Sequence, residues 1–137
     1  MYHRVAEPEI DPWGLAVSAA HFDEHMALLR ASRTVMPLAE LVDCYKCNVL
    51  PRNSVAITFD DGYADNLANA KPILGRYGLP ATLFLATGTV GSRTEYWWDE
   101  LERVILLNSD GLDATVQIGA EAVTLRVSQG RDAGVAG

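Results

Sequence analysis

Residues 54–62 read Ser-Val-Ala-Ile-Thr-Phe-Asp-Asp-Gly, and this stretch decides the fold class. Its first six residues form an apolar, β-branched run of strand length, which indicates a buried parallel strand. The run ends abruptly at Asp60, Asp61 and Gly62. In α/β folds, ligands and catalytic groups are found at the carboxyl ends of such strands. The stretch therefore predicts both a parallel sheet and a candidate site at its edge.

The segments after this strand complete a βαβ unit. Residues 64–77 have the apolar spacing of a helix, which Pro72 is expected to kink or restart and Gly78 to end. Residues 81–86, Ala-Thr-Leu-Phe-Leu-Ala, are predicted to form a second buried strand. A strand, a helix and a strand within about thirty residues predict a right-handed crossover in a parallel sheet covered by helices.

The rest of the chain is predicted to add a short opening strand, three helices and a hairpin. The opening strand is expected at residues 2–5. The helices are expected after the N-cap Ser18, from Pro37 to about residue 47, and from residue 96 onward. Apolar residues then recur with a period of two, which predicts a β-hairpin over residues 114–127. Residues 128–137 show no periodicity and are expected to be a disordered tail.

Composition and charge exclude several functions. The chain has 137 residues, enough for one core, and a net charge of -7, which disfavours binding to nucleic acid. No apolar run approaches the roughly 20 residues of a membrane-spanning helix, and no signal-peptide core follows the first residues. Cys44 and Cys47 are too few for a disulfide-stapled scaffold or a complete four-cysteine zinc site.

The adjacent carboxylates of Asp60 and Asp61 are the leading candidate site. The structural alternative is a turn with an acidic helix start, because Asp-Gly is common in turns and aspartate suits the positive end of a helix. At the mouth of an apolar sheet, however, two adjacent negative charges would repel each other unless a cation shares the site, and a divalent metal would serve. Haloacid-dehalogenase-type phosphatases do not fit, because they need Asp-x-Asp and this chain has Gly62 in the second position.

Residues 58–66, Thr-Phe-Asp-Asp-Gly-Tyr-Ala-Asp-Asn, resemble the first motif of the NodB-like polysaccharide deacetylases, carbohydrate esterase family four. The likeness extends to residues 2–5 upstream and to residues 77–84 and 97–99 downstream, and it spans residues 2 to about 107. It implies an α/β fold in which residues 1–127 are the incomplete N-terminal portion of a distorted (β/α) barrel with a C-terminal β-hairpin.

The resemblance also implies a metal-dependent hydrolase that removes N-acetyl groups from N-acetylhexosamine units of a polysaccharide or oligosaccharide, commonly with zinc. Carried over by position, Asp61 would be a metal ligand and Asp60 the general base. His3 would be the acid that protonates the departing amine. The alternative for His3 is a packed or hydrogen-bonded histidine. The family usually acts outside the cytoplasm, and neither localisation nor oligomeric state can be predicted from this sequence.

The sequence departs from the family pattern in its histidines. The family completes its metal site with His-[Ser/Thr]-x-x-His after the Asp pair, whereas the three histidines here, His3, His21 and His25, all precede it. We therefore expect an incomplete metal site and a chain that is inactive as a fragment of a longer domain. The alternative function is a non-catalytic remnant or a weak glycan-binding module.

Three further patterns have structural alternatives that we favour. His21 and His25 match the H-x-x-E-H pattern of inverted zinc proteases, but exposed histidines on an outer helix explain them better. Cys44 and Cys47 form a lone C-x-x-C, which is a weak indication of a zinc or redox site. The pair Trp97 and Trp98 could stack on sugar rings, although tryptophans at a helix start more often anchor that helix by packing.

Overall fold

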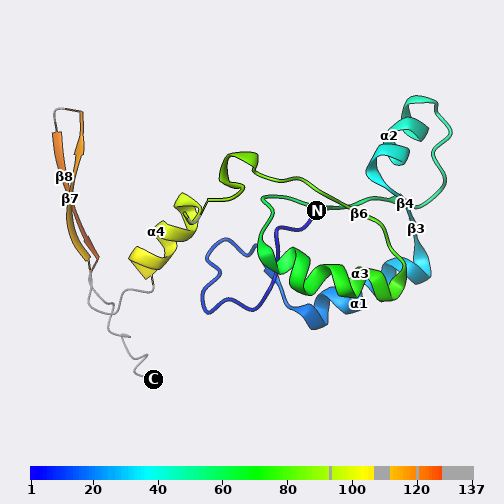
Figure 1. Ribbon diagram of the computed structural model, residues 1–137, viewed down its shortest axis with the longest axis horizontal. Coiled ribbons are helices and arrows are strands. Elements are labelled where there is room, and N and C mark those ends of the chain that lie inside the picture. The colour runs from blue at the N-terminus through cyan, green and yellow to red at the C-terminus, as the bar shows by residue number, and fades with distance from the viewer. Residues whose placement is uncertain (93, 107–111, 120, 128–137) are drawn as a thin grey trace, which may run out of the picture. The chain divides into compact units, whose positions relative to one another are not determined.

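A computed structural model describes residues 1–92, 94–106, 112–119 and 121–127 (Figure 1). The chain divides into two compact units, Met1–Val90 and Gly91–Gly137. The first unit contains β1 (Arg4–Val5), β2 (Ala16–Val17), α1 (Ala19–Ser32), β3 (Thr34–Val35), α2 (Leu38–Lys46), β4 (Ser54–Val55), β5 (Ile57–Phe59), η1 (Asn66–Ala70), α3 (Lys71–Tyr77), β6 (Ala81–Leu83) and η2 (Thr87–Thr89). The second contains α4 (Trp97–Leu106), β7 (Leu112–Ile118) and β8 (Glu121–Val127).

The parallel pairing of β5 with β6 confirms the predicted βαβ unit. Ile57 lies opposite Ala81 and Phe59 lies opposite Leu83, with η1 and α3 forming the connection. On the other side of β5, Tyr2 forms a parallel bridge to Phe59. The amide of Tyr2 donates to the carbonyl of Thr58 at 2.8 Å. The N-terminal segment, β5 and β6 therefore lie side by side in this order.

The predicted strand over residues 54–59 is divided into two short strands with different neighbours. Ser54 and Val55 of β4 pair in parallel with Thr34 and Val35 of β3, whereas β5 pairs with β6. A third parallel pair joins β1 to β2. Apolar patterning identified the run as a strand, but the point at which its pairing changes depends on neighbours about twenty residues away in each direction.

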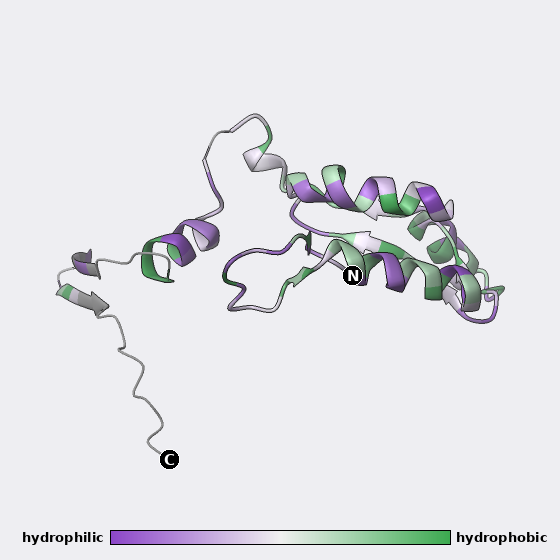
Figure 2. Ribbon diagram, turned by 90° about the horizontal axis from the view of Figure 1, so that it is seen from below, coloured by the Kyte–Doolittle hydropathy of each residue, from purple (hydrophilic) through white to green (hydrophobic). Residues whose placement is uncertain are grey.

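Helix α1 begins where the sequence predicted. The Ser18 hydroxyl accepts a hydrogen bond from the amide of His21 at 3.1 Å, which caps the helix. Phe22 and Met26, one turn apart, are fully buried and join Val5, Ile57 and the other core residues. In Figure 2 the helices carry apolar and polar residues together, as expected of helices that place one face on a core.

The helix after the Asp pair changes its winding near Pro72. Residues 66–70 form a π-helix, in which the amide of Lys71 donates to the carbonyl of Asn66, and α3 continues to Tyr77. Pro72 has no amide hydrogen, so it cannot bond to the carbonyl four residues earlier in a regular α-helix. Gly78 ends α3 in the left-handed conformation, as predicted.

The prediction that residues 81–86 form a buried strand was wrong in its burial and in its length. The strand ends at Leu83, and about half of the side-chain surface of Leu83, Phe84 and Leu85 is exposed. Among the described residues, β6 pairs only with β5, so its other edge has no neighbouring strand to cover it. An apolar strand is buried only when neighbouring elements of the fold cover it, and the composition of the segment does not show whether they do.

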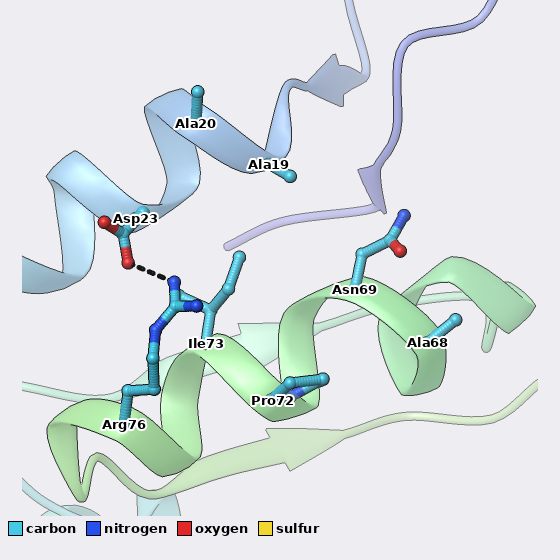
Figure 3. Close-up of a pocket in the computed structure, with 8 residues that line it drawn as sticks. All are labelled: Ala19, Ala20, Asp23, Ala68, Asn69, Pro72, Ile73 and Arg76. Carbon is cyan, nitrogen blue, oxygen red and sulfur yellow. Dashed lines mark hydrogen bonds and ion pairs between the residues drawn. The ribbon is translucent and has the colours of Figure 1, made fainter.

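A groove of about 450 Å³ lies between α1 and the η1–α3 segment (Figure 3). Small residues, including Ala19, Ala20 and Ala68, leave space along it. At one end Arg76 donates to the carboxylate of Asp23 at 2.6 Å, and this hydrogen bond lowers the pKa of Asp23. The groove is on the helical face, and the Asp pair does not line it.

The described residues of the second unit form one helix and a β-hairpin. Helix α4 begins at Trp97 and has an acidic first turn, which suits the positive end of a helix. Strands β7 and β8 pair antiparallel, with Ile118 opposite Glu121. The predicted tail, residues 128–137, lies outside the described residues. None of the described helices combines the length and hydrophobicity needed to cross a bilayer.

Candidate active site

The two aspartates occupy a sharp turn immediately after β5. The amide of Gly62 donates to the carbonyl of Asp60 at 2.8 Å, and Asp61 between them has a φ of +68°. A bond between residues two apart around a positive φ defines a γ-turn, a conformation that is strained for a residue with a side chain. The amide of Ala86 donates to the carbonyl of Asp61 at 3.3 Å and attaches this turn to the segment after β6.

Gly62 is required by the same turn. Its φ is +86°, which favours glycine, and a Cβ atom built on it would lie 2.6 Å from Cδ2 of Leu85. A side chain at this position would therefore push Leu85 away from the turn. The Asp-Asp-Gly sequence is thus matched to a backbone path that places two carboxylates at the end of the strand.

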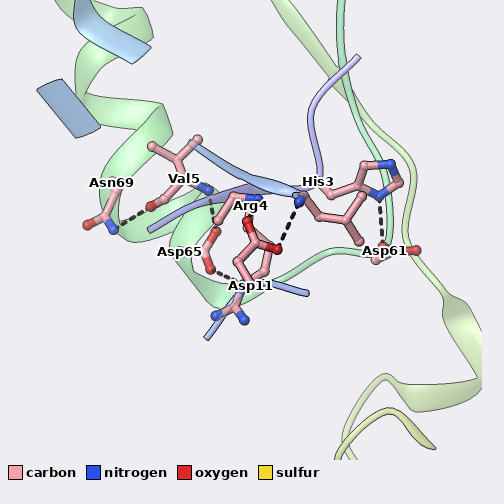
Figure 4. Close-up of polar contacts among 9 residues, drawn as sticks. His3, Arg4, Val5, Asp11, Asp61, Asp65 and Asn69 are labelled. Carbon is pink, nitrogen blue, oxygen red and sulfur yellow. Dashed lines mark hydrogen bonds and ion pairs between the residues drawn. The ribbon is translucent and has the colours of Figure 1, made fainter. Parts of the chain in front are cut away.

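His3 lies against Asp61, although 58 residues separate them in the sequence. The His3 Nδ1 and Asp61 Oδ2 atoms are 3.0 Å apart, and about a quarter of each side chain is exposed (Figure 4). The bridge between Tyr2 and Phe59 explains the position, since it sets the N-terminal segment beside the end of β5. The sequence-based candidates Asp60, Asp61 and His3 are therefore brought to one place by the fold.

The two carboxylates differ in their surroundings. Asp61 is paired with His3, whereas the side chain of Asp60 has no hydrogen bond or ion pair with any of the described residues. The backbone of Asp60 is fixed, because its amide donates to the carbonyl of Tyr2 at 3.0 Å. This leaves the Asp60 carboxylate able to accept a proton from a bound molecule, while Asp61 orients the imidazole.

Comparison with known proteins relates the segment that contains the Asp pair to a family. The family model for polysaccharide deacetylases matches residues 48–115, which include the Asp pair. Residues 48–115 are part of a polysaccharide deacetylase domain. A putative polysaccharide deacetylase of Bacillus subtilis, YxkH, is 32% identical over 95 residues, covering 68% of this chain and 33% of that protein. A poly-beta-1,6-N-acetyl-D-glucosamine N-deacetylase of Staphylococcus aureus is 33% identical over 89 residues, covering 64% of this chain and 31% of that protein.

Solved structures of deacetylases share the fold of this chain. The Streptococcus pyogenes deacetylase PplD, in complex with acetate, superposes with a TM-score of 0.59 at 25% identity, over 74% of this chain and 48% of that one. A de-N-acetylase from Aggregatibacter actinomycetemcomitans superposes with a TM-score of 0.60 at 22% identity, over 90% of this chain and 58% of that one. The chain spans about a third of the length of the two curated relatives.

Asp65 and Asn69 hold the strand that carries His3, and the sequence analysis did not identify them. The Asp65 carboxylate accepts hydrogen bonds from the Val5 amide at 2.9 Å and from Nε of Arg4 at 3.1 Å (Figure 4). One helical turn later, Nδ2 of Asn69 donates to the Val5 carbonyl at 2.7 Å. The spacing of four residues places both side chains on one helix face, but nothing in the sequence links that face to residues 60 positions earlier.

Replacing Asp65 with Asn is expected to lower the free energy of unfolding by about 1–3 kcal/mol, because a charge-assisted bond to Arg4 is lost in a partly buried place. Only 12% of the Asp65 side chain is exposed. Urea denaturation measures the change, with Asp43→Asn on the exposed face of α2 as the control. An equal loss in both variants would contradict a specific role for Asp65.

Tyr2 supports the position of His3 from the core side. Its ring packs edge-on against Phe22 at 5.0 Å and stacks on Phe59 at 5.6 Å. Burial raises the pKa of the Tyr2 phenol, which stays protonated, and its oxygen lies 3.1 Å from Nδ1 of His25. This contact gives His25 a structural role on α1.

The described residues do not form a complete metal centre. Among the described residues, no group of three or more histidine, cysteine, aspartate or glutamate side chains is arranged to hold an ion. Structural and catalytic zinc sites use at least three protein ligands, whereas His3 and Asp61 are two and bind each other. The two cysteines are free thiols, Cys44 partly buried and Cys47 exposed. The donor set therefore does not fit a zinc ion without further ligands.

Proposed function

We propose that this chain is the N-terminal portion of a polysaccharide deacetylase that hydrolyses the N-acetyl amide of N-acetylhexosamine units. The observation that carries the proposal is the contact between His3 and Asp61 beside Asp60 at the end of β5, where both aspartates lie within the family match. An acid and a base side by side at a strand end are what amide hydrolysis requires. The relatives named as deacetylases support the substrate class.

The proposed reaction uses the three side chains in order. Water adds to the carbonyl carbon of the N-acetyl group while the Asp60 carboxylate accepts one of the water protons. The bond between carbon and nitrogen then breaks, the nitrogen takes a proton from His3, and acetate and a free amine are the products. Asp61 accepts the hydrogen bond from Nδ1 of His3, so that Nε2 carries the proton to the amine.

A divalent metal, zinc by family resemblance, is part of this proposal for the longer domain only. Bound there, it would acidify water and polarise the carbonyl, with Asp61 as one ligand. Because the described residues supply too few donors, no step above passes through the metal. We further propose that the 137-residue chain is inactive by itself.

One feature supports the proposal that residues 1–127 are part of a larger (β/α) barrel. Leu83, Phe84 and Leu85 expose apolar surface beside an edge of β6 that pairs with no other strand among the described residues. Apolar strand ends and strand edges are normally covered, and further strands of a barrel would cover these.

Zinc retention by the isolated chain tests the incomplete site. After incubation with zinc and removal of the excess, the wild-type chain is expected to keep less than about one ion per ten molecules by mass spectrometry, because tight sites need three or four ligands. Near-stoichiometric zinc that Asp61→Ala abolishes would contradict the incomplete site. Acetate release from N-acetylglucosamine oligomers, measured on the chain and on a protein that carries the full domain, tests the activity itself.

The alternative proposal is a non-catalytic remnant or a weak glycan-binding module. Among the described residues, the edge of β6 that has no partner strand and the incomplete donor set favour it for the chain by itself. The two proposals differ in the full-length protein, where only the deacetylase releases acetate.

A further inference from the structure

Three consecutive aromatic residues at the start of α4 form an ordered cluster. The rings of Tyr96 and Trp98 stack with centroids 4.7 Å apart and planes 5° apart. The Trp97 ring stands edge-on to that of Trp98, at 5.5 Å and 82°. The stacked pair therefore braces Trp97 from one side and fixes the orientation of its indole.

The indole of Trp97 is exposed, unlike that of a tryptophan that anchors a helix. Its exposed fraction is 69%, whereas Tyr96 and Trp98 are partly buried. In the described part of the chain, Trp97 belongs to no buried core cluster. Tryptophan is highly buried on average. An exposed indole held in place by neighbouring rings therefore indicates a binding surface for a molecule with one flat, apolar face.

Polar side chains surround the aromatic cluster. Nε of Arg103 donates to Glu95 at 3.1 Å, which connects the residue before Tyr96 to the second turn of α4. Asp99 and Glu100 lie in the first turn of the helix. A pyranose ring offers an apolar face of C–H groups for stacking and a rim of hydroxyls, so an aromatic surface with carboxylates at its edge suits it.

We propose that Trp97, braced by Tyr96 and Trp98, is a platform that stacks on a sugar ring of an N-acetylated polysaccharide. The inference rests on the proposed function for the choice of ligand. It adds to that function a binding contact whose residues all belong to the second unit, whereas the Asp pair belongs to the first.

The test is an NMR titration of the 137-residue chain with an N-acetylglucosamine tetrasaccharide, observing the indole N–H signals. The signal of Trp97 is expected to shift, and Trp97→Ala is expected to weaken binding about tenfold or more. Trp13→Ala is the matched control, because Trp13 is exposed to 68% and is expected to leave affinity unchanged. Trp97→Leu separates stacking from packing: leucine preserves apolar contact with the protein but offers no flat ring.

The outcomes distinguish this inference from the proposed function. Loss of binding in Trp97→Ala and Trp97→Leu, with unchanged spectra elsewhere, supports the platform. Wild-type affinity in Trp97→Leu, or no binding by the wild-type chain, overturns it, whether or not the full-length protein releases acetate. Binding that depends on Trp97 without acetate release by the full-length protein would instead overturn the deacetylase proposal and leave the platform in place.

Discussion

Replacing Asp60 with Asn in a protein that carries the complete deacetylase domain is expected to lower the rate of acetate release by about 10²–10⁴-fold, the usual contribution of a general base. Asparagine has nearly the same shape and keeps the backbone bond to Tyr2, but its amide cannot accept the water proton. Within the described residues the Asp60 carboxylate has no hydrogen bond or ion pair, so the substitution breaks none there.

The measurement is the rate constant for acetate release from N-acetylglucosamine oligomers, together with the metal content of the same preparation. Glu24→Gln, on the exposed face of α1, is the control for a lost surface charge. Full activity of the Asp60→Asn variant would show that Asp60 is not the general base. Loss of metal together with activity would instead assign Asp60 to the metal site.

The comparison of Asp60 with Asp61 shows what the sequence could predict about the site. An apolar strand followed by Asp-Asp-Gly was enough to place both carboxylates at a strand end, because pairing within a βαβ unit is a local property. The sequence did not show which carboxylate is engaged, because that depends on His3, which β-bridge formation brings from 58 residues away. The family resemblance named all three residues. Among the described residues, the geometry pairs Asp61 with His3 and gives the Asp60 side chain no hydrogen bond.

The fold was predictable where the structure of a segment depends on residues close to it in the sequence. The cap at Ser18, the buried face of α1 and the stop at Gly78 follow from short-range chemistry and were confirmed. The exposure of Leu83 was not predictable, because burial of a strand depends on its neighbours in the sheet. The bonds from Asp65 to Arg4 and Val5 were missed for the same reason, since they join segments 60 residues apart.

Replacing Phe22 with Ala is expected to have the largest effect on stability, about 3–5 kcal/mol, because it leaves a cavity in a fully buried place. Phe22 has no exposed surface and contacts the rings of Tyr2 and Phe59. A loss of this size is comparable with the whole stability of a small domain. Urea denaturation followed by circular dichroism measures it, and Phe22→Leu should fall between Ala and the wild type.

Leu28→Ala is the matched control, since it lies on the same helix and is largely exposed. Equal denaturation midpoints for Phe22→Ala and Leu28→Ala would show that the core does not depend on Phe22. The substitution should also affect the site, because the Tyr2 ring rests on Phe22 and the next residue is His3. In Phe22→Leu, which is expected to stay folded, the NMR signals of the His3 ring should therefore move while those of His21, exposed on α1, should not. The buried aromatic cluster would then be what holds the imidazole against Asp61, and packing and catalysis would depend on the same few side chains.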